Sequence, residues 1–523
     1  MAAGIDSKIS AKTSRAAKGY KKLKAWHKWV SIVLTLFVLL FTLSGIVLNH
    51  RSWFSEVDVN RNLLPRDYRY QNWNLASLRG SVEKDTNELL VYGNIGVWKT
   101  NGDFSQFEDF NNGFPDGIDN RKISKIIRTE KGKLIAGTYF GLYGLKGDNW
   151  EKLPLPVEEN RIVDLLSYDE KIYILTRSDL MIADCDQPTN EAKVIMLPNA
   201  EDDDYKIGLF KTLWVIHSGE IYGIAGQLFV DFMALALIFL TLTGLILWLF
   251  PGWIKRKRSN KSGVTLLVRT MKFSLKWHNK LGWYLAIFLI ITAATGMFLR
   301  PPLLIPIANA RVDKIPFSKL NQPNPWYDKL RAITYDDYHG RFILSTSEGF
   351  YYSDNHFSSE LKKFETQPPV SVMGINVFEQ LGQGGFLVGS FSGIFSWFPE
   401  RNYVENVLTR QEYIPTGQNS APFSEQSIAG MVWDGASRPY LFDYIKGAEP
   451  FLHEQNFPEM PREIVADSPM SIWNLALEVH TARIYRPLIG DFYILVIPLS
   501  GLALLFIVIS GFWMYWTGFR RKS

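Results

Sequence analysis

The stretch WHKWVSIVLTLFVLLFTLSGIVLNHR, Trp26–Arg51, decides the fold of this chain. It has no charged residue between 31 and 48, and about 20 apolar residues cross the roughly 30 Å hydrocarbon core of a bilayer. A second stretch, WHNKLGWYLAIFLIITAATGMFLRP (Trp277–Pro301), aligns with the first without a gap, so that His27 matches His278. The sequence therefore predicts two membrane helices, each with a histidine at one end.

Two further apolar runs, at 228–250 and 490–516, repeat more weakly. Each is preceded by a similar motif, HSGEIYGIAG from His217 and HTARIYRPLIG from His480. The chain thus divides into two halves, each ordered as histidine, helix, soluble segment, histidine and helix. Such a parallel duplication predicts a pseudo-two-fold axis along the membrane normal.

Basic residues indicate the orientation of the helices. Residues 1–25 contain seven Lys and Arg against one acid, 254–276 contain eight and no acid, and the chain ends in Arg520, Arg521 and Lys522. The positive-inside rule places all three regions in the cytoplasm. We therefore expect a multi-pass protein of a bacterial inner (cytoplasmic) membrane, with both termini cytoplasmic and the large segments periplasmic. Since topology explains the lysine clusters, no nucleic-acid partner is expected.

The fold class expected is a membrane α-helical four-helix core, built of two repeated helix pairs, with large extracytoplasmic all-β, propeller-like segments. Short runs of Gly, aromatic and branched residues recur in these segments every 40–45 residues or so, which is the period of a propeller blade. One six-bladed propeller shared by both segments, or two separate all-β domains, would account for them. The expected order is a basic N-terminus at 1–27, helices at 28–49, 226–250, 280–300 and 490–516, outer β segments at 50–225 and 301–489, a cytoplasmic linker at 251–279 and a tail at 517–523.

Composition and missing motifs exclude several kinds of site. With Cys185 as the single cysteine, the chain has no intramolecular disulfide, cysteine-based zinc site or C-x-x-C-H haem attachment. It also has no Walker loop, no G-x-G-x-x-G opening a helix and no G-x-S-x-G, and so shows no sign of a nucleotide, flavin or hydrolase site. Electrons passing through the chain would come from a membrane quinol or a separate protein.

Four histidines occupy repeat-equivalent positions at two depths. An antiparallel bundle brings His27 and His278 to one depth and His217 and His480 to the other. Two facing neutral imidazoles are axial ligands for b-type haem, and helix bundles hold such cofactors in their cores. One or two haem b groups are therefore expected, with these histidines on the iron. The alternative is that each is an interfacial residue bonded to lipid headgroups or backbone.

Other charged residues near the outer ends of the helices have open roles. Asp231 is the one charge within its apolar run, so it is a functional candidate, either as part of a proton route or as a neighbour of a haem propionate. The alternative is that its side chain snorkels to the membrane interface. His50 is a weaker ligand candidate, because its repeat equivalent is a proline. Arg300 and Arg483 would pair with propionates or an anionic substrate, or anchor helices to headgroups.

The motifs LKAWHKWVSIVLTLFVLLFTLSGIVL, KWHNKLGWYLAIFLIITAATGMFL, IHSGEIYGIAG and VHTARIYRPLIG resemble the PepSY-associated transmembrane family. That family includes bacterial inner-membrane ferric-siderophore reductases. The resemblance covers the helices, about a quarter of the chain, and implies b-type haem held by His27, His278, His217 and His480. The outer segments do not resemble a PepSY domain.

The function expected is electron transfer through haem to a ferric chelate on the outer face for iron uptake, in contact with membrane lipid. The protein is therefore expected to be an oxidoreductase of the ferric-chelate reductase type. A second hypothesis is a membrane-anchored sensor or assembly factor whose propeller-like part binds an envelope partner. A transporter is a third, and four helices are few for it.

Overall fold

The computed structural model describes residues 2–185, 192–259, 263–369, 373–414 and 426–518. The chain forms two compact units, each assembled from separated parts of the sequence. A helical unit contains Met1–Ser52, Lys206–Asn321 and Trp473–Ser523. A β unit contains Trp53–Tyr205 and Gln322–Ile472.

The first outer segment supplies three antiparallel sheets to the β unit. They are β2–β5 (Gly80–Asp85, Glu88–Gly93, Gly96–Asn101, Phe107–Asp109), β6–β9 (Ile123–Arg128, Leu134–Thr138, Leu142–Lys146, Asn149–Leu153) and β10–β13 (Ile162–Tyr168, Lys171–Thr176, Leu180–Asp184, Lys193–Ile195).

The second outer segment supplies three more. They are β16–β19 (Leu330–Asp336, Arg341–Thr346, Gly349–Ser353, Lys362–Lys363), β20–β24 (Val377–Gly382, Gly385–Ser390, Gly393–Phe398, Tyr403–Asn406, Gln411–Glu412) and β25–β27 (Ile428–Trp433, Pro439–Asp443, Gly447–Pro450). A short helix, α6 (Arg462–Ala466), follows them.

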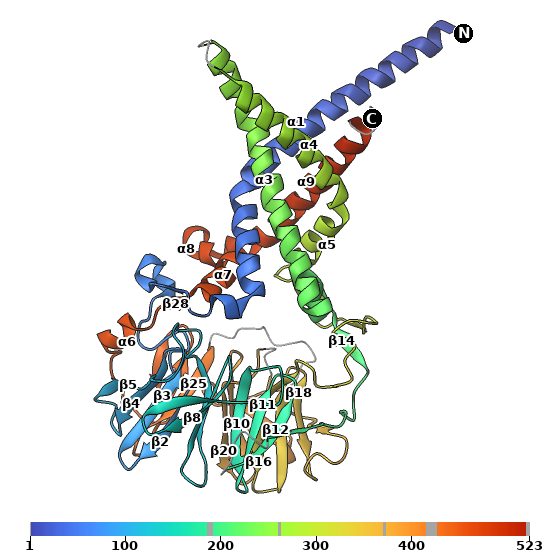
Figure 1. The fold of residues 1–523 in the computed structure, drawn as a ribbon. Helices are drawn as coiled ribbons and strands as arrows, with labels where there is room; N and C mark the ends of the chain where they lie inside the picture. The colour runs from blue at the N-terminus through green and yellow to red at the C-terminus, as the bar shows by residue number, and fades with distance from the viewer. Residues whose placement is uncertain (1, 186–191, 260–262, 370–372, 415–425, 519–523) are drawn as a thin grey trace. The chain divides into compact units, whose positions relative to one another are not determined.

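The six sheets form one closed ring in which the first strands of neighbouring sheets contact each other. Figure 1 shows the sheets side by side. Contacts run in order from β2 to β6, β10, β16, β20 and β25, and β25 returns to β2. A two-stranded pair, β1 (Asp58–Val59) with β28 (Met470–Ser471), joins the start of the first segment to the end of the second. The ring is thus the shared six-bladed arrangement, and the alternative of two separate all-β domains is wrong.

A repeated hairpin explains the Gly-aromatic rhythm of the sequence. The hydroxyl of Thr138 donates to the carbonyl oxygen of Gly141 at 2.9 Å, and Thr346 donates to Gly349 in the same way at 2.8 Å. The backbone at Gly349 has φ +131°, a region that side chains with a Cβ rarely adopt. Branched and aromatic residues after each glycine, such as Tyr351, are buried between neighbouring sheets.

The helical unit contains α1 (Ala2–Asn49), α2 (Leu209–Ser218), α3 (Gly223–Ser259), α4 (Thr265–Tyr284), α5 (Ala286–Met297), α7 (Ile472–His480), α8 (Arg486–Ile489) and α9 (Val496–Gly518), with the strand pair β14 (Lys206–Gly208) and β15 (Arg311–Asp313). In the described chain, three helices within 18–49, 220–259 and 483–518 are long and apolar enough to cross a membrane, and α4 with α5 makes a fourth span if the bent pair counts as one. The protein is therefore a multi-pass membrane protein.

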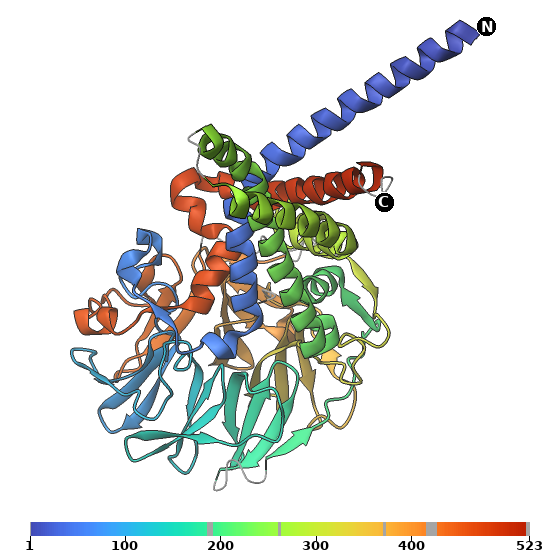
Figure 2. The same ribbon diagram turned by 45° about the horizontal axis from the view of Figure 1, so that its top comes forward.

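The long helices pack against one another. α1 contacts α3 and α9, α4 contacts α3 and α9, and α5 contacts α9 (Figure 2). Gly501 of α9 faces Met297 at the end of α5, where an added Cβ would lie 2.7 Å from the Cβ of Met297. Small residues let helix backbones approach closely in membranes.

The expectation of a single helix at 280–300 is wrong. The chain bends by 66° between α4 and α5, at Leu285, and α4 begins inside the expected cytoplasmic linker. Gly282 lies just before the bend, where glycine weakens a helix. Trp283 stacks on Phe512 of α9 with ring centres 4.3 Å apart, which holds the end of α4 against α9.

The two expected outer β segments also contain helices. α2 and α7 fall within 50–225 and 301–489, and both belong largely to the helical unit. They carry two of the predicted site histidines.

Candidate functional site

His27 of α1 and His278 of α4 face each other inside the helical unit. Their ring centres are 6.5 Å apart and their planes are nearly perpendicular, at 86°. Nδ1 of His27 lies 2.8 Å from the hydroxyl of Ser510 on α9. Nδ1 of His278 lies 3.0 Å from the hydroxyl of Thr243 and 3.0 Å from the carbonyl oxygen of Leu240, both on α3. The structure thus brings the first predicted pair together.

His217 of α2 and His480 of α7 form the second pair, with ring centres 6.0 Å apart. Nδ1 of His217 lies 2.9 Å from the carbonyl oxygen of Thr292 on α5. Nδ1 of His480 lies 3.0 Å from the carbonyl oxygen of Phe41 and 3.1 Å from the hydroxyl of Ser44, both on α1. Each pair therefore draws its rings from one half of the chain and the other.

Hydrogen bonding fixes which nitrogen of each neutral ring carries the proton. A backbone carbonyl only accepts, so Nδ1 donates in His217, His278 and His480. The hydroxyl of Ser510 donates its own proton to Ile507 at 3.0 Å, so it accepts from Nδ1 of His27. In all four rings the lone pair is then on Nε2, the form in which a histidine ligates a metal.

Each of the four histidine rings packs against a Ser/Thr-Gly dipeptide on a neighbouring helix. The hydroxyl lies near Nδ1, and an added Cβ on the glycine would lie 2.5–3.6 Å from Cε1 of the ring. The four sets are Ser44–Gly45 with His480, Thr243–Gly244 with His278, Thr295–Gly296 with His217, and Ser510–Gly511 with His27. The hydroxyl contacts with the rings were not foreseen from the sequence.

The two outer histidines end their helices in the same local geometry. Two residues after His217, Gly219 adopts a left-handed backbone with φ +81°, and two residues after His480, Ala482 does so with φ +60°. A short 3-10 turn follows in both cases and leads toward the next long helix. An added Cβ at Gly219 would collide with the carbonyl oxygen of Gly226, so this turn requires glycine.

The spacing of each pair fits one metal ion between two imidazoles. A metal–nitrogen bond of about 2.0–2.1 Å on each side, with a ring nitrogen about 1.2 Å from its ring centre, places the centres roughly 6.4 Å apart. The observed values are 6.5 and 6.0 Å. Among the described residues no group of three or more His, Cys, Asp or Glu side chains could hold a metal ion. Each pair thus consists of two imidazoles, a donor set that fits a macrocycle bringing its own nitrogens.

Asp231 and His50 contact each other. Nε2 of His50 lies 2.5 Å from Oδ2 of Asp231, and Nδ2 of Asn49 donates to Oδ1 of Asp231 at 3.1 Å. Asn49 also lies 3.2 Å from the carbonyl oxygen of Ser218, the residue that follows His217. This network was not predicted, although both Asp231 and His50 had been singled out separately.

Arg300 and Arg483 lie close enough to interact electrostatically, near Glu478. Nη2 of Arg483 donates to Glu478 at 2.5 Å, whereas its Nε is buried without a hydrogen-bond partner among the described residues. The hydroxyl of Tyr485 is likewise buried and unpaired there. Buried polar atoms without partners are costly, and a carboxylate or another acceptor would satisfy these two.

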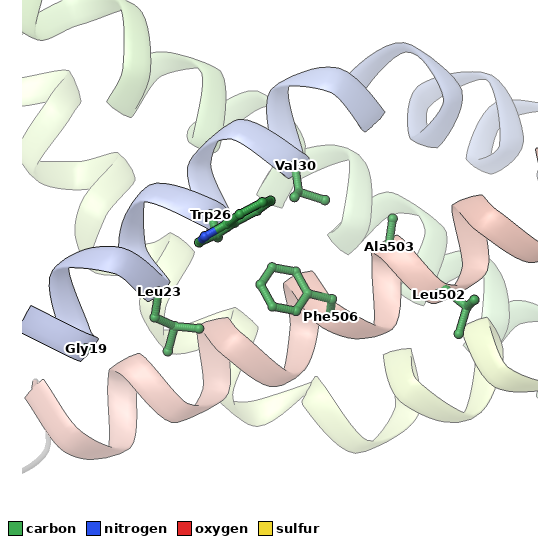
Figure 3. A pocket seen from close by; sticks show the side chains of 7 residues that line it. All are labelled: Gly19, Leu23, Trp26, Val30, Leu502, Ala503 and Phe506. Carbon is green, nitrogen blue, oxygen red and sulfur yellow. The ribbon is translucent and has the colours of Figure 1, made fainter. Parts of the chain in front are cut away.

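An apolar groove lies between α1 and α9, beside the first histidine pair (Figure 3). It has a volume of about 630 Å³ and is lined by Gly19, Leu23, Trp26, Val30, Leu502, Ala503 and Phe506. Trp26 directly precedes His27. The lining has the character of a surface for a hydrocarbon chain.

The fold and the site define a multi-pass membrane protein with two facing imidazole pairs between its helices. The family model described as "PepSY-associated TM region" matches residues 3–250 and 183–518, so the chain belongs to this family. No curated protein shows significant similarity to the chain.

Several solved structures resemble parts of the molecule. The extracellular domain of a putative hybrid two-component system from Bacteroides thetaiotaomicron has 9% identity and a TM-score of 0.35, and the match covers 72% of this chain and 33% of that one. A streptogramin B lyase has 8% identity and a TM-score of 0.33, with 72% and 94% covered. PorZ of Porphyromonas gingivalis has 11% identity and a TM-score of 0.31, with 75% and 39% covered. The chain thus spans about a third of the length of the first.

Proposed function

We propose that each histidine pair binds one b-type haem and that the protein passes electrons to a ferric chelate on the outer face of a bacterial inner membrane. The observation that carries this proposal is the geometry of the pairs. Two rings at a spacing suited to one metal ion, each with Nδ1 donating, would form an axial ligand set.

Haem would supply reversible one-electron chemistry, and the chain's own residues would set its position and potential. Ser510, Thr243 and the backbone carbonyls hold the rings in one tautomer and one orientation. Arg483 and Arg300 would neutralise the carboxylates of the group held by the outer pair. The apolar helix faces around the rings exclude water.

The two pairs lie at different depths, so electrons would move between two sites. Along α1, His27 belongs to the first pair and Ser44 contacts the second, and 17 residues of helix rise about 25 Å. A membrane quinol is the proposed donor. Its hydrocarbon tail would occupy the groove beside Trp26, next to the cytoplasmic pair (Figure 3).

The outer face is the proposed place of reduction because the basic regions predict that both chain ends are cytoplasmic. Transfer of one electron to an iron(III) chelate weakens the hold of the chelator and releases iron(II). No further group transfer by the protein is needed, so the proposed activity is that of a ferric-chelate reductase.

The test is the reduced-minus-oxidised absorption spectrum of the purified protein, with haem quantified per chain. We expect two b-type haems in the wild type, and one each in His278→Ala and His217→Ala. His356→Ala is the control, because His356 is exposed on the β unit. If wild-type protein expressed with ample haem showed no Soret band, the proposal would be overturned. Full haem content in both variants would also overturn it.

A second function, a membrane-anchored binding module or sensor, is favoured by the ring of sheets that both outer segments build together. Propellers are common binding platforms, and a fold alone does not define function. If the protein is a binding module or sensor, the His278→Ala variant should keep the full activity of the wild type. If the haem proposal holds, the same variant should lose electron transfer. The same variant therefore separates the two.

A further inference from the structure

Arg79 reaches from the first sheet of the propeller to the fifth. It directly precedes β2 of the first sheet, yet its Nη1 lies 3.4 Å from Oδ1 of Asn376, which precedes β20 of the fifth sheet. The sixth sheet lies between these two in the ring. The sixth sheet has a glycine, Gly430, at the point where Arg79 passes. An added Cβ there would collide with the backbone of Arg79. The guanidinium therefore lies at the end of the axis where the inner strands begin.

Among the residues that the structure describes, this guanidinium has no acidic partner. Within the described parts of the chain no carboxylate forms an ion pair with Arg79, and the titratable groups near it are the phenols of Tyr444 and Tyr92. The Arg79 side chain is largely enclosed, and this burial lowers its pKa. An unpaired buried charge is unfavourable, and a ligand that neutralises it recovers that loss.

The neighbours of Arg79 are fixed and aromatic. Nδ2 of Asn376 donates to the carbonyl oxygen of Ile428 at 2.8 Å, which turns Oδ1 toward Arg79. Phe391 and Tyr444, on hairpin turns of the fifth and sixth sheets, contact each other with ring centres 5.6 Å apart. A rigid cation beside aromatic rings is an arrangement that binds small organic anions.

The positive charge of Arg79 contrasts with the next layer along the axis. There Lys125 interacts with Asp164 and Glu379, and Asp164 accepts from the backbone of Ile333 at 2.9 Å. That layer contains one cation and two carboxylates, so it offers no free positive charge to an incoming anion. An incoming anion would therefore be held at Arg79 and would not replace an existing partner.

We propose that this end of the propeller axis is a binding site for the carboxylate group of a small anionic ferric chelate, held by Arg79. The inference rests on the proposed function and names its substrate class as anionic rather than cationic chelates. A carboxylate accepts two parallel N–H bonds from a guanidinium. The rings of Tyr444 and Phe391 would contact the body of the chelate.

The test is binding of gallium(III) citrate to the full-length haem-loaded protein, measured by calorimetry at low ionic strength. Arg79→Met should raise the Kd at least tenfold, and Arg79→Lys should raise it less, because an ammonium keeps the charge but loses the paired geometry. Lys146→Met is the charge-matched control, since Lys146 is an exposed residue of β8 with 78% of its side chain accessible. A positively charged gallium(III) hydroxamate should bind no more weakly to Arg79→Met than to the wild type.

An unchanged Kd in folded Arg79→Met would overturn the inference, and so would an absence of gallium(III) citrate binding to the wild type. If Arg79→Met does not fold, the same comparison is made with Arg79→Lys. Gallium(III) accepts no electron, so the measurement does not depend on haem. Full haem content with an Arg79-independent Kd would refute this inference alone, and absent haem with an Arg79-dependent Kd would refute the proposed function alone.

Discussion

The carboxylate of Asp231 and the imidazole of His50 lie 2.5 Å apart and join α3 to the end of α1. Only 13% of the Asp231 side chain and 9% of the His50 side chain are accessible. Because Asn49 links the same carboxylate to the residue after His217, the network supports the backbone beside the outer histidine pair. Asp231 thus has a specific structural partner.

Asp231→Asn should destabilise the helical unit by about 1–3 kcal/mol, because a buried imidazole loses its charged acceptor. The measurement is thermal unfolding in detergent, followed by the helical circular dichroism signal. Asp491→Asn is the matched control, since the Asp491 side chain is 86% accessible and its ion pair is exposed. Equal melting temperatures for the two variants would contradict a structural role for the Asp231 network.

Ser510→Ala should weaken haem retention more than Thr295→Ala. Ser510 lies 2.8 Å from Nδ1 of His27, whereas Thr295 lies 3.5 Å from Nδ1 of His217, which the carbonyl oxygen of Thr292 already holds at 2.9 Å. Loss of a hydrogen bond that orients a ligand commonly costs 10–100-fold or so in affinity. Transfer of haem to apomyoglobin measures the effect, and the reverse order would refute the proposed tautomer at His27.

Gly296→Ala should abolish the outer site, whereas Gly244→Ala should be tolerated. An added Cβ at 296 would lie 2.5 Å from Cε1 of His217, so the ring must move, but at 244 it would lie 3.6 Å from Cε1 of His278, an ordinary contact. Alanine in a helix is favoured over glycine by up to about 1 kcal/mol. Haem content per chain should therefore fall to one in Gly296→Ala only, and two haems in both variants would disprove the proposed positions.

Lys125→Met should destabilise the β unit by about 3–5 kcal/mol, because it leaves the charges of Asp164 and Glu379 without their cation. Burial alone would lower the pKa of Lys125, but Tyr92, Glu379 and Asp164 outweigh it and raise this pKa. Denaturant unfolding, followed by tryptophan fluorescence, measures the loss.

The loss from Lys125→Met should shrink as pH falls. Burial raises the pKa of Asp164, and Lys125 opposes this, so removing the lysine raises that pKa further. A carboxyl group with a raised pKa in the folded state binds its proton more readily there than in the unfolded chain, so acid favours folding of the variant. Lys125→Arg, which keeps the charge, should show little of this pH dependence, and a loss that grows toward low pH would contradict the assignment.

The histidine pairs are predictable from the sequence because the duplication places His27 opposite His278 and His217 opposite His480. A repeat carries long-range information that a single helix pattern does not, since equivalent positions share a depth around a pseudo-axis. The period of the β segments likewise predicted propeller blades. Only the contacts in the structure distinguished one ring from two domains.

The remaining features depend on packing between distant parts of the chain. The bend at Leu285 lies beside Trp283, whose stacking on α9 is a long-range contact that no local pattern in 280–300 encodes. The contact of Asp231 with His50 and the reach of Arg79 to Asn376 join residues 181 and 297 positions apart. Neither contact has a repeat equivalent that would have revealed it.

The shared ring imposes an order on how the molecule is made. Chains are synthesised from the N-terminus, and the first three sheets emerge with the inner faces of β2 and β10 uncovered. These faces stay uncovered while Lys206–Asn321, which contains α2, α3, α4 and α5, is synthesised and inserted. While the half-ring is open, the chain is vulnerable to proteolysis and aggregation. The duration of this state is set by translation and membrane insertion of the intervening helices.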